Sequence, residues 1–373
     1  MEKEKKENNT SKSKKSIFAK IIIGLAVLIA IAIIVFVCYV LHLLSLPTID
    51  NTGTPPYIDP AVTTTEEEEE TTDDLPVITP TSQGDGVSIE ETTVAYREED
   101  GVYNIILLGV DKNAGYRTDS MIVVTINQND NSIKMTSFMR DILVNIPGKS
   151  PDRLNTVYAK GGSKLLFQIF RENFGIDLYG YMLVDYYSLA DVVDALGGVE
   201  IYVSEKIAEY LNETNYIENE AYRTLIPGAT QLLNGAQVVG YCRQRKIGNG
   251  VESNDFARTQ RQRAVLNAIY EKFRTKSLTE LLGVMEKVLP LVVTDMNSSE
   301  MINIATKAIN AGLGDIEQLR VPVNGTYTGA YYQETEDSLK KSVLQVDFEA
   351  NASALHEFIF GKDEVPEEST AGK

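Results

Sequence analysis

Four charged residues between positions 103 and 147 have the types and spacing that phosphate chemistry needs. They are two carboxylates and two guanidinium groups at the ends of apolar runs: Asp111, Asp119, Arg117 and Arg140. Aspartate oxygens can hold a hard divalent cation such as Mg²⁺ or Mn²⁺, and guanidinium groups can bind phosphate oxygens in pairs. Together these groups would suit phosphoryl transfer, with Asp111 and Asp119 as candidate metal ligands. Charged residues are also common at strand ends in general, so this segment alone leaves both interpretations open.

Short apolar runs predict the strands that would position these residues. Ile105–Val110 is short, rich in branched side chains and followed by Asp111, so it predicts a buried strand that ends at this carboxylate. Met121–Ile126 and Ser132–Phe138 predict two more strands, and the Gln-Asn-Asp-Asn sequence between them predicts a hairpin turn.

Later segments alternate between strand and helix patterns. Strands are predicted at 180–186, 199–203, 316–323 and 342–350, and helices at 157–174, 188–196, 277–289, 298–312 and 351–360. Residues 204–226 are polar and predict an irregular surface segment, and 231–235 predict a short helical turn. The alternation predicts an α/β fold, and the opening hairpin makes its sheet mixed.

The first 41 residues predict a membrane anchor. Ile21 to Leu41 is an unbroken apolar stretch of 21 residues, about the length that a helix needs to cross a bilayer. Seven lysines precede it, so the positive-inside rule places the N-terminus in the cytoplasm and the rest of the chain outside. A cleaved signal peptide is the alternative, but the apolar run is longer than a typical signal core, and no small-x-small cleavage site follows it.

Composition excludes several kinds of site. The chain of 373 residues has only two cysteines and two histidines. Cys38 lies in the apolar stretch and Cys242 lies far along the chain, so no disulfide framework is expected. His42 and His356 leave almost nothing for a Ser-His-Asp triad or a histidine metal site. The net charge of -18 is concentrated in residues 50–99, which hold fourteen acids and one base, so it says little about the site.

A second cluster of charged residues lies between Arg243 and Arg263. It holds six basic and two acidic residues, and five of the six bases are arginines. Arginine favours paired binding of oxyanions, and an extracytoplasmic location argues against nucleic acid, although a solvated basic face stays open as the alternative. Asp255 predicts the N-cap of a long helix in which Arg258 and Gln262 are four residues apart and share a face.

These observations divide the chain into five parts. They are a basic cytoplasmic N-terminus (1–20), a transmembrane helix (21–41), an acidic disordered linker (42–99), a folded catalytic domain (100–361) and a flexible tail (362–373). The linker is rich in Thr, Pro, Glu and Asp, so it cannot bury enough apolar surface to fold and should extend through self-repulsion.

Seven sequence blocks resemble the LytR–CpsA–Psr family, whose enzymes attach anionic polymers to bacterial cell walls. Within about residues 103–275 they are NIILLGVD, YRTDSMIVVTIN, SFMRDILVNIPG, RLNTVYAKGG, DALGGVEIYV, LNGAQVVGYCRQR and NDFARTQRQ. Their order and the layout of anchor plus ectodomain are typical of this family. The resemblance implies a three-layer αβα ectodomain with a central mixed sheet. It also implies an apolar tunnel for a polyprenyl chain, with the pyrophosphate at its mouth.

Matched position by position, the resemblance implies roles for individual residues. The catalytic set would be Asp111, Asp119, Arg117 and Arg140, with Asp111 and Asp119 similar to the family's metal-associated aspartates for Mg²⁺ or Mn²⁺. The substrate-binding set would be Arg153, Arg243, Arg245, Asp255, Arg258 and Gln262. Arg153 stands where the family often has lysine, and Met139 stands where many members have proline.

The resulting hypothesis is a membrane-anchored phosphotransferase. It would attach an anionic glycopolymer, such as teichoic acid or capsule, from a polyprenyl-pyrophosphate carrier to peptidoglycan. A carboxylate would accept the proton of the acceptor hydroxyl, and Asp119 is the first candidate. Two alternatives stay open: hydrolysis of the polyprenyl pyrophosphate at the same site, and a non-catalytic envelope regulator that binds lipid phosphates.

We predict that a reporter enzyme fused after Lys373 is active only outside the cytoplasm, because seven lysines precede the apolar stretch. Fusions of the same chain to one reporter that works only outside the cell membrane and one that works only in the cytoplasm measure this. Activity of the cytoplasmic reporter would overturn both the topology and the choice of substrate.

Overall fold

The structure, a computed structural model, describes residues 39–54, 75–79, 94–112, 115–247, 254–312, 314–335 and 337–362, without the side chains of Asp111, Asn254 and Leu278. Contacts between residues divide the chain into two units, Met1–Leu46 and Pro47–Lys373, and the fold given below is that of the second unit. The predicted segments 1–20, 21–41 and 362–373 lie almost wholly outside the described residues. Within the described residues, no helix is long and apolar enough to cross a membrane.

Within the described residues, seven strands form one mixed sheet. In sheet order they are β1 (Thr48–Ile49), β11 (Val293–Thr294), β8 (Gly180–Asp185), β3 (Val102–Asp111), β4 (Arg117–Asn127), β5 (Ser132–Phe138) and β12 (Glu317–Val321). The three strands predicted between residues 105 and 138 are confirmed, and they form an antiparallel meander at the centre of the sheet. The sheet is mixed, as predicted, because β8 is parallel to β3 and β12 is parallel to β5.

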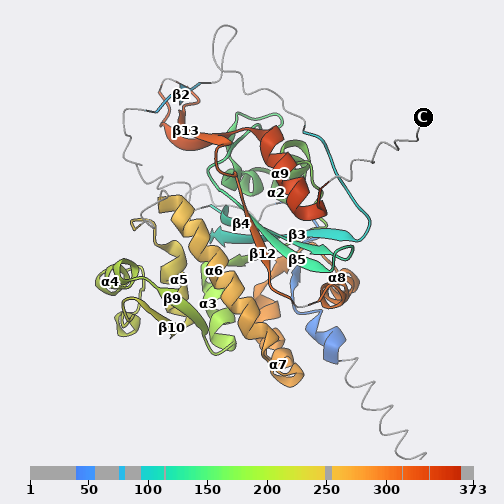
Figure 1. Cartoon of the computed structure of the whole chain (residues 1–373), viewed down its shortest axis with the longest axis vertical. Coiled ribbons are helices and arrows are strands. Elements are labelled where there is room, and N and C mark those ends of the chain that lie inside the picture. The colour runs from blue at the N-terminus through green and yellow to red at the C-terminus, as the bar shows by residue number, and fades with distance from the viewer. Residues whose placement is uncertain are drawn as a thin grey trace, which may run out of the picture. The chain divides into compact units, whose positions relative to one another are not determined.

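Helices flank both faces of this sheet (Figure 1). On one side lie α2 (Val157–Phe174) and α9 (Phe348–Phe360), and on the other lie α3 (Tyr186–Ala195), α5 (Gly235–Arg243) and α6 (Asn254–Arg274). Two further helices follow α6, namely α7 (Leu278–Val288) and α8 (Ser298–Asn310). The prediction of an α/β domain with a central mixed sheet is therefore confirmed.

The main core lies between the sheet and the pair α2 and α9. The ring centroid of Phe138 on β5 lies 4.7 Å from that of Phe170 and 4.8 Å from that of Phe174, both on α2. Phe348 and Leu355 of α9 belong to the same buried cluster. Burial of these large side chains fixes the sheet from one face.

A second core supports the helices on the other side. It is built by the hairpin of β9 (Val199–Val203) and β10 (Ala229–Leu233), by α4 (Glu205–Glu213) and by parts of α3, α5 and α6. The prediction that residues 204–226 are irregular is wrong for α4, because Ile207 and Leu211 place an apolar stripe at helical spacing in an otherwise charged segment. The helical turn predicted at 231–235 is also wrong, since residues 231–233 belong to β10.

Parts of the predicted linker (42–99) are folded, which corrects the expectation of a wholly disordered tether. Thr48–Ile49 forms β1 at the edge of the sheet, and β2 (Val77–Ile78) pairs with β13 (Tyr327–Tyr332), which also pairs with β14 (Lys341–Val346). In residues 94–100, the Val94 amide donates to a carbonyl at the end of α2, and Val94 is buried. Short runs with β-branched residues account for these contacts, and the acidic composition of the whole segment conceals them. Linker residues 55–74 and 80–93 lie outside the described ones.

The chain after β1 packs closely on α2. The Tyr181 hydroxyl donates a hydrogen bond to Asp50 Oδ2 at 2.7 Å. Gly162 interrupts α2 with a φ of +69°, and a Cβ atom there would lie 2.1 Å from the carbonyl oxygen of Gly53. Only glycine fits this close approach in this backbone conformation, so α2 has a break where the early chain crosses it.

Candidate functional site

The strands bring most of the predicted site residues to one edge of the sheet. β3, β8 and β5 end at this edge, and β4 begins there. Gly109 pairs with Ser120 and Val110 pairs with Thr118, so Asp119 has no partner on β3. Such a β-bulge changes the direction in which a side chain points. Here the residue is Asp119, which is only 7% exposed.

Arg140 connects three carboxylates from separate parts of the chain. Its Nη1 donates to Asp119 Oδ1 at 3.0 Å, and its Nε lies 3.4 Å from Asp141 Oδ1 and 3.3 Å from Asp255 Oδ1. The Asn155 amide donates to the Arg140 carbonyl at 3.1 Å, which fixes the loop after β5. Because Arg140 is 7% exposed, water screens these attractions only weakly.

The first two turns of α6 add a second buried guanidinium group. Arg258 Nη2 lies 2.8 Å from Asp255 Oδ1, and Arg258 is 1% exposed. Its Nε and Nη1 are buried and make no hydrogen bond to any residue that the structure describes, and the same holds for Gln262 Nε2, one turn later. Buried donors without acceptors cost free energy, so these atoms point to a ligand that supplies oxygen.

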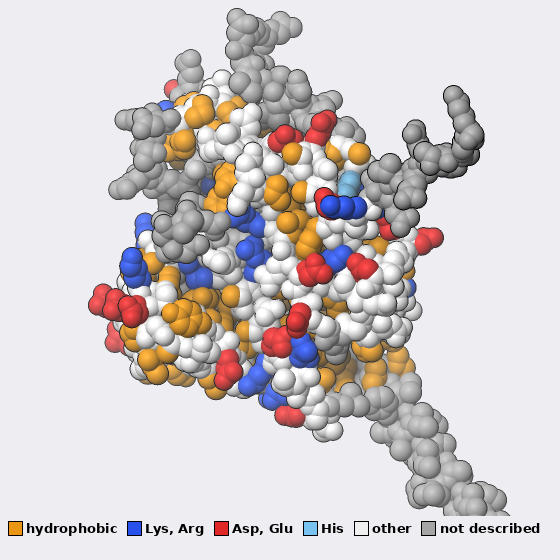
Figure 2. Space-filling model, viewed as in Figure 1, with side chains coloured by type: hydrophobic (Ala, Val, Ile, Leu, Met, Phe, Trp, Pro, Cys, Tyr) orange, Lys and Arg blue, Asp and Glu red, His pale blue; other side chains and the backbone are white. Residues whose placement is uncertain are grey.

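Arg245 and Arg153 complete what we call the arginine cluster, which consists of Arg140, Arg153, Arg245 and Arg258 with Asp119, Asp141 and Asp255. Arg245 Nη2 lies 3.5 Å from Asp119 Oδ2, and Arg153 Nη1 lies 3.6 Å from Asp141 Oδ1. Four arginines against three aspartates leave one excess positive charge (4 − 3) when all are ionised. Figure 2 shows Lys and Arg side chains gathered near the N-terminal half of α6. An anion is the ligand that this balance favours.

The cluster separates the pKa values of its carboxyl groups. Burial would raise the pKa of Asp119, but Arg140 and two further arginines outweigh burial and hold this pKa well below its usual range. The pKa of Asp255 is lowered in the same way, against burial and mainly by Arg258. For Asp141, burial raises the pKa to about 6, Arg140 opposes the rise, and the charge of Asp255 adds to it. Asp141 is thus the carboxyl of the cluster that titrates nearest to neutral pH.

Three predicted site residues are not part of the arginine cluster. Arg117 is half-buried at the start of β4 and forms no ion pair with a described residue. Arg243 pairs instead with Glu218, with Nη1 and Oε1 3.4 Å apart. Asp111 ends β3 at the same edge, and its side chain lies outside the described part.

Sequence reasoning missed one member of the cluster, Asp141, and one residue that contacts it, Asn155. Asp141 contacts two of its arginines, and Asn155 Nδ2 lies 3.5 Å from Asp119 Oδ1. The position of Asp141 next to Arg140 was the available signal for the first. The sequence shows no comparable signal for Asn155, because only the packing of the following loop brings it near β4.

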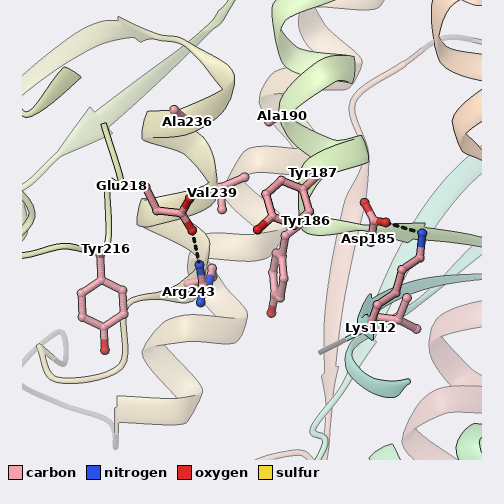
Figure 3. Close-up of a pocket in the computed structure, with 11 residues that line it drawn as sticks. Lys112, Asp185, Tyr186, Tyr187, Ala190, Tyr216, Glu218, Ala236, Val239 and Arg243 are labelled. Atoms are coloured by element: carbon pink, nitrogen blue, oxygen red, sulfur yellow. Dashed lines mark hydrogen bonds and ion pairs between the residues drawn. The ribbon is translucent and has the colours of Figure 1, made fainter. Parts of the chain in front are cut away.

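A cavity of about 360 Å³ lies beside the cluster, among α3, α5 and the end of β3 (Figure 3). Its wall includes two ion pairs and three tyrosines: Lys112 with Asp185, Arg243 with Glu218, and Tyr186, Tyr187 and Tyr216. Charges paired within the wall can still hydrogen-bond to hydroxyl groups, and aromatic faces offer apolar area. This mixture suits a polar ligand better than a hydrocarbon chain.

The fit of a metal ion depends on Asp119 and Asp111. Within the described side chains, no three Asp, Glu, His or Cys residues are grouped so that they could hold a metal ion. Asp119 is ionised, as a ligand must be, and Mg²⁺ commonly takes one or two carboxylates and completes its shell with water and substrate phosphates. Of the two predicted ligands, only Asp119 has a described side chain, and its carboxylate is suited to be one such ligand.

The amino-acid sequence matches the profile of the LytR_cpsA_psr family over residues 61–347. The chain is 29% identical over 270 residues to the regulatory protein MsrR of Staphylococcus aureus strain Mu50, which covers 70% of this chain and 76% of that protein. It is also 29% identical over 258 residues to the polyisoprenyl-teichoic acid–peptidoglycan teichoic acid transferase TagU of Oceanobacillus iheyensis, covering 66% of this chain and 75% of that protein.

Solved structures share the fold. TagT bound to LI-WTA matches with a TM-score of 0.55 at 21% identity, over 73% of this chain and 96% of that chain. The LytR-CPS2A-psr family protein YwtF (TagT) with bound octaprenyl pyrophosphate lipid matches with a TM-score of 0.52 at 21% identity, over 73% and 98%. Since the family profile also spans most of the folded domain, the chain belongs to the LytR–CpsA–Psr family.

Proposed function

We propose that this protein is a phosphotransferase that moves an anionic glycopolymer from a polyprenyl-pyrophosphate carrier to a hydroxyl group of peptidoglycan. The observation that carries the proposal is the buried guanidinium of Arg258, whose Nε and Nη1 have no acceptor among the described residues. A pyrophosphate would supply both the missing acceptors and the negative charge that the arginine cluster favours. The names of two relatives support the substrate: TagU is a teichoic acid transferase, and YwtF holds octaprenyl pyrophosphate.

Arg245 and Arg258 would stabilise the charge that develops on the phosphate oxygens. Their positions are fixed before any substrate arrives, because Asp119 pairs with Arg245 and Asp255 pairs with Arg258. Donors that are already in place need no reorganisation at the moment of reaction, and this preorganisation is usually a large part of electrostatic catalysis.

Asp141 is better suited than Asp119 to accept the proton of the attacking hydroxyl, and we propose it in place of that first candidate. Asp119 is a weak base because arginines keep its pKa low. The pKa of Asp141, about 6, lies closer to neutral pH, where a general base works best. Arg140 and Arg153, at 3.4 and 3.6 Å, would hold the carboxylate in place.

We also propose Mg²⁺ or Mn²⁺ as the cofactor and the cell membrane as the location. Asp119, with Asp111 at the end of β3, would hold the ion, which would neutralise charge on the pyrophosphate when bound. The lysines and the apolar stretch at 21–41 support a single-pass anchor with the catalytic domain outside the cytoplasm. The reporter fusions described above test the location.

A non-catalytic regulator that binds lipid phosphates is the second candidate function. One observation favours it, namely that the relative MsrR is called a regulatory protein. Incubating the full chain with a polyprenyl-pyrophosphate donor, with and without a glycan acceptor, separates the possibilities. Product only with acceptor supports transfer, equal turnover without acceptor indicates hydrolysis, and tight binding without product indicates a regulator.

Arg245 offers the first test of the site, because at 36% side-chain exposure it can be truncated with less harm to folding than Arg258. We expect Arg245→Ala to lower the transfer rate roughly 100- to 1,000-fold, by analogy with the loss of an oxyanion donor. Arg245→Lys should recover little, because an ammonium group lacks the planar fork. Arg274→Ala, at the far end of α6, is the control. Near-wild-type transfer by Arg245→Lys would show that the site is misplaced.

Asp141 should set the acid limb of the pH–rate profile. A general base must be deprotonated, so kcat/KM should rise with pH through the pKa of about 6 and level off above it. In Asp141→Asn we expect a loss of roughly 100-fold or more and no acid limb near this pH. Asp119→Asn should be slower but retain the limb. An unchanged limb in Asp141→Asn would remove this residue from proton transfer.

Chelation tests the ion. We expect exhaustive treatment with EDTA to abolish transfer, and Mg²⁺ or Mn²⁺ to restore it, because oxygen donors favour hard cations. Zn²⁺ should restore less, since the two predicted ligands, Asp111 and Asp119, offer only oxygen. Full activity after chelation would exclude the ion from the mechanism.

A further inference from the structure

Tyr186 follows the end of β8 at the sheet edge where the arginine cluster lies, and its hydroxyl group has no hydrogen-bond partner among the described residues. It is the first residue of α3, directly after β8, and it lines the cavity (Figure 3). Its hydroxyl makes no hydrogen bond to any residue in the described part of the chain. A phenol in such a position either faces water or is reserved for a ligand.

The surroundings of Tyr186 hold its ring in place. Asp185 caps α3, since its Oδ1 accepts from the Ser188 amide at 2.7 Å, and it also pairs with Lys112. The guanidinium carbon of Arg243 lies 5.6 Å from the Tyr186 ring centroid, within the range of a cation–π contact. The backbone and the ring are therefore restrained, and the hydroxyl group has a defined position.

Strand pairing brings Tyr186 to the sheet edge where the cluster lies, because the preceding residue, Asp185, pairs with Val110, and Val110 pairs with Thr118, next to Asp119. Burial raises the pKa of Tyr186 well above its usual range, the charge of Asp119 adds to the rise, and Arg258 and Arg245 oppose it. The phenol is thus protonated at neutral pH and can donate. The Asp119 oxygens already face Arg140 and Arg245, so this carboxylate is engaged by other donors.

We propose that Tyr186 donates a hydrogen bond to a phosphate oxygen held by the arginine cluster, and that it is a further substrate-contacting residue. The inference rests on the proposed function, because it assumes that the cluster binds a pyrophosphate. A neutral donor adds a directed bond without adding charge, and the ring of Tyr186 lines the cavity. Tyr186 would thereby fix the phosphate at the point where the rest of the substrate enters the cavity.

The test measures binding of inorganic pyrophosphate to the full chain in detergent micelles by titration calorimetry. Tyr186→Phe keeps the ring and removes only the hydroxyl, and we expect it to weaken binding roughly tenfold, as for a hydrogen bond to a charged group. Tyr187→Phe is the matched control, since the neighbouring residue lines the same cavity and is 65% exposed. It should bind within about twofold of wild type. Thermal unfolding of both variants without ligand should match wild type.

The outcomes separate this inference from the proposed function. If wild type binds, Arg245→Ala loses binding and Tyr186→Phe binds normally, the role of Tyr186 is overturned while the pyrophosphate site stands. If wild type does not bind pyrophosphate, the proposed function fails and the inference fails with it. If Tyr186→Phe loses binding and also unfolds at a lower temperature, its hydroxyl is structural, and the proposal is overturned.

Discussion

The contacts of Arg140 with three carboxylates are the interaction on which the rest of the site depends. Asp119 comes from β4, Asp141 from the loop after β5 and Asp255 from α6, so one guanidinium group joins three segments that are distant in sequence. Three carboxylates this close and this buried would repel one another strongly without it. The position of α6 at the end of the sheet therefore depends on the attraction between Arg140 and these three carboxylates.

The arginines between residues 243 and 263 have two different roles: some are available to a ligand, and others hold α6 in place. Arg261 donates to the carbonyls of Tyr241 and Gln244 at the end of α5, and Arg263 donates to Ser137 Oγ on β5. These two hold α6 against its neighbours, and this support lets Arg258 stay buried with unused donors. The unpaired buried donors of Arg258 cost free energy of folding. The hydrogen bonds of Arg261 and Arg263, three and five positions further along α6, offset this cost.

The sequence predicted the parts of this structure that periodicity encodes. The apolar runs at 105–110 and 121–126 predicted two of the central strands, because a buried strand is largely apolar. The turn before Ser132 predicted the third strand as a hairpin partner. The arginine-rich segment was visible as a local reversal of charge. The bulge at Asp119 was not, because an extra residue in a strand leaves the apolar pattern almost unchanged. Tyr186 was equally hidden, since an aromatic residue at the start of an apolar helix is usually part of the core.

The edge strand β1 sets the order in which the sheet can be completed. Its partner β11 begins at Val293, which lies 245 residues after Thr48 (293 − 48). A chain that is synthesised from its N-terminus must therefore keep Thr48 and Ile49 unpaired until most of the domain has been made. Contacts of such long range form late, because the entropy of closing the loop between them must be overcome first. β1 is thus the first strand of the described sheet to be made and among the last to find its place in it.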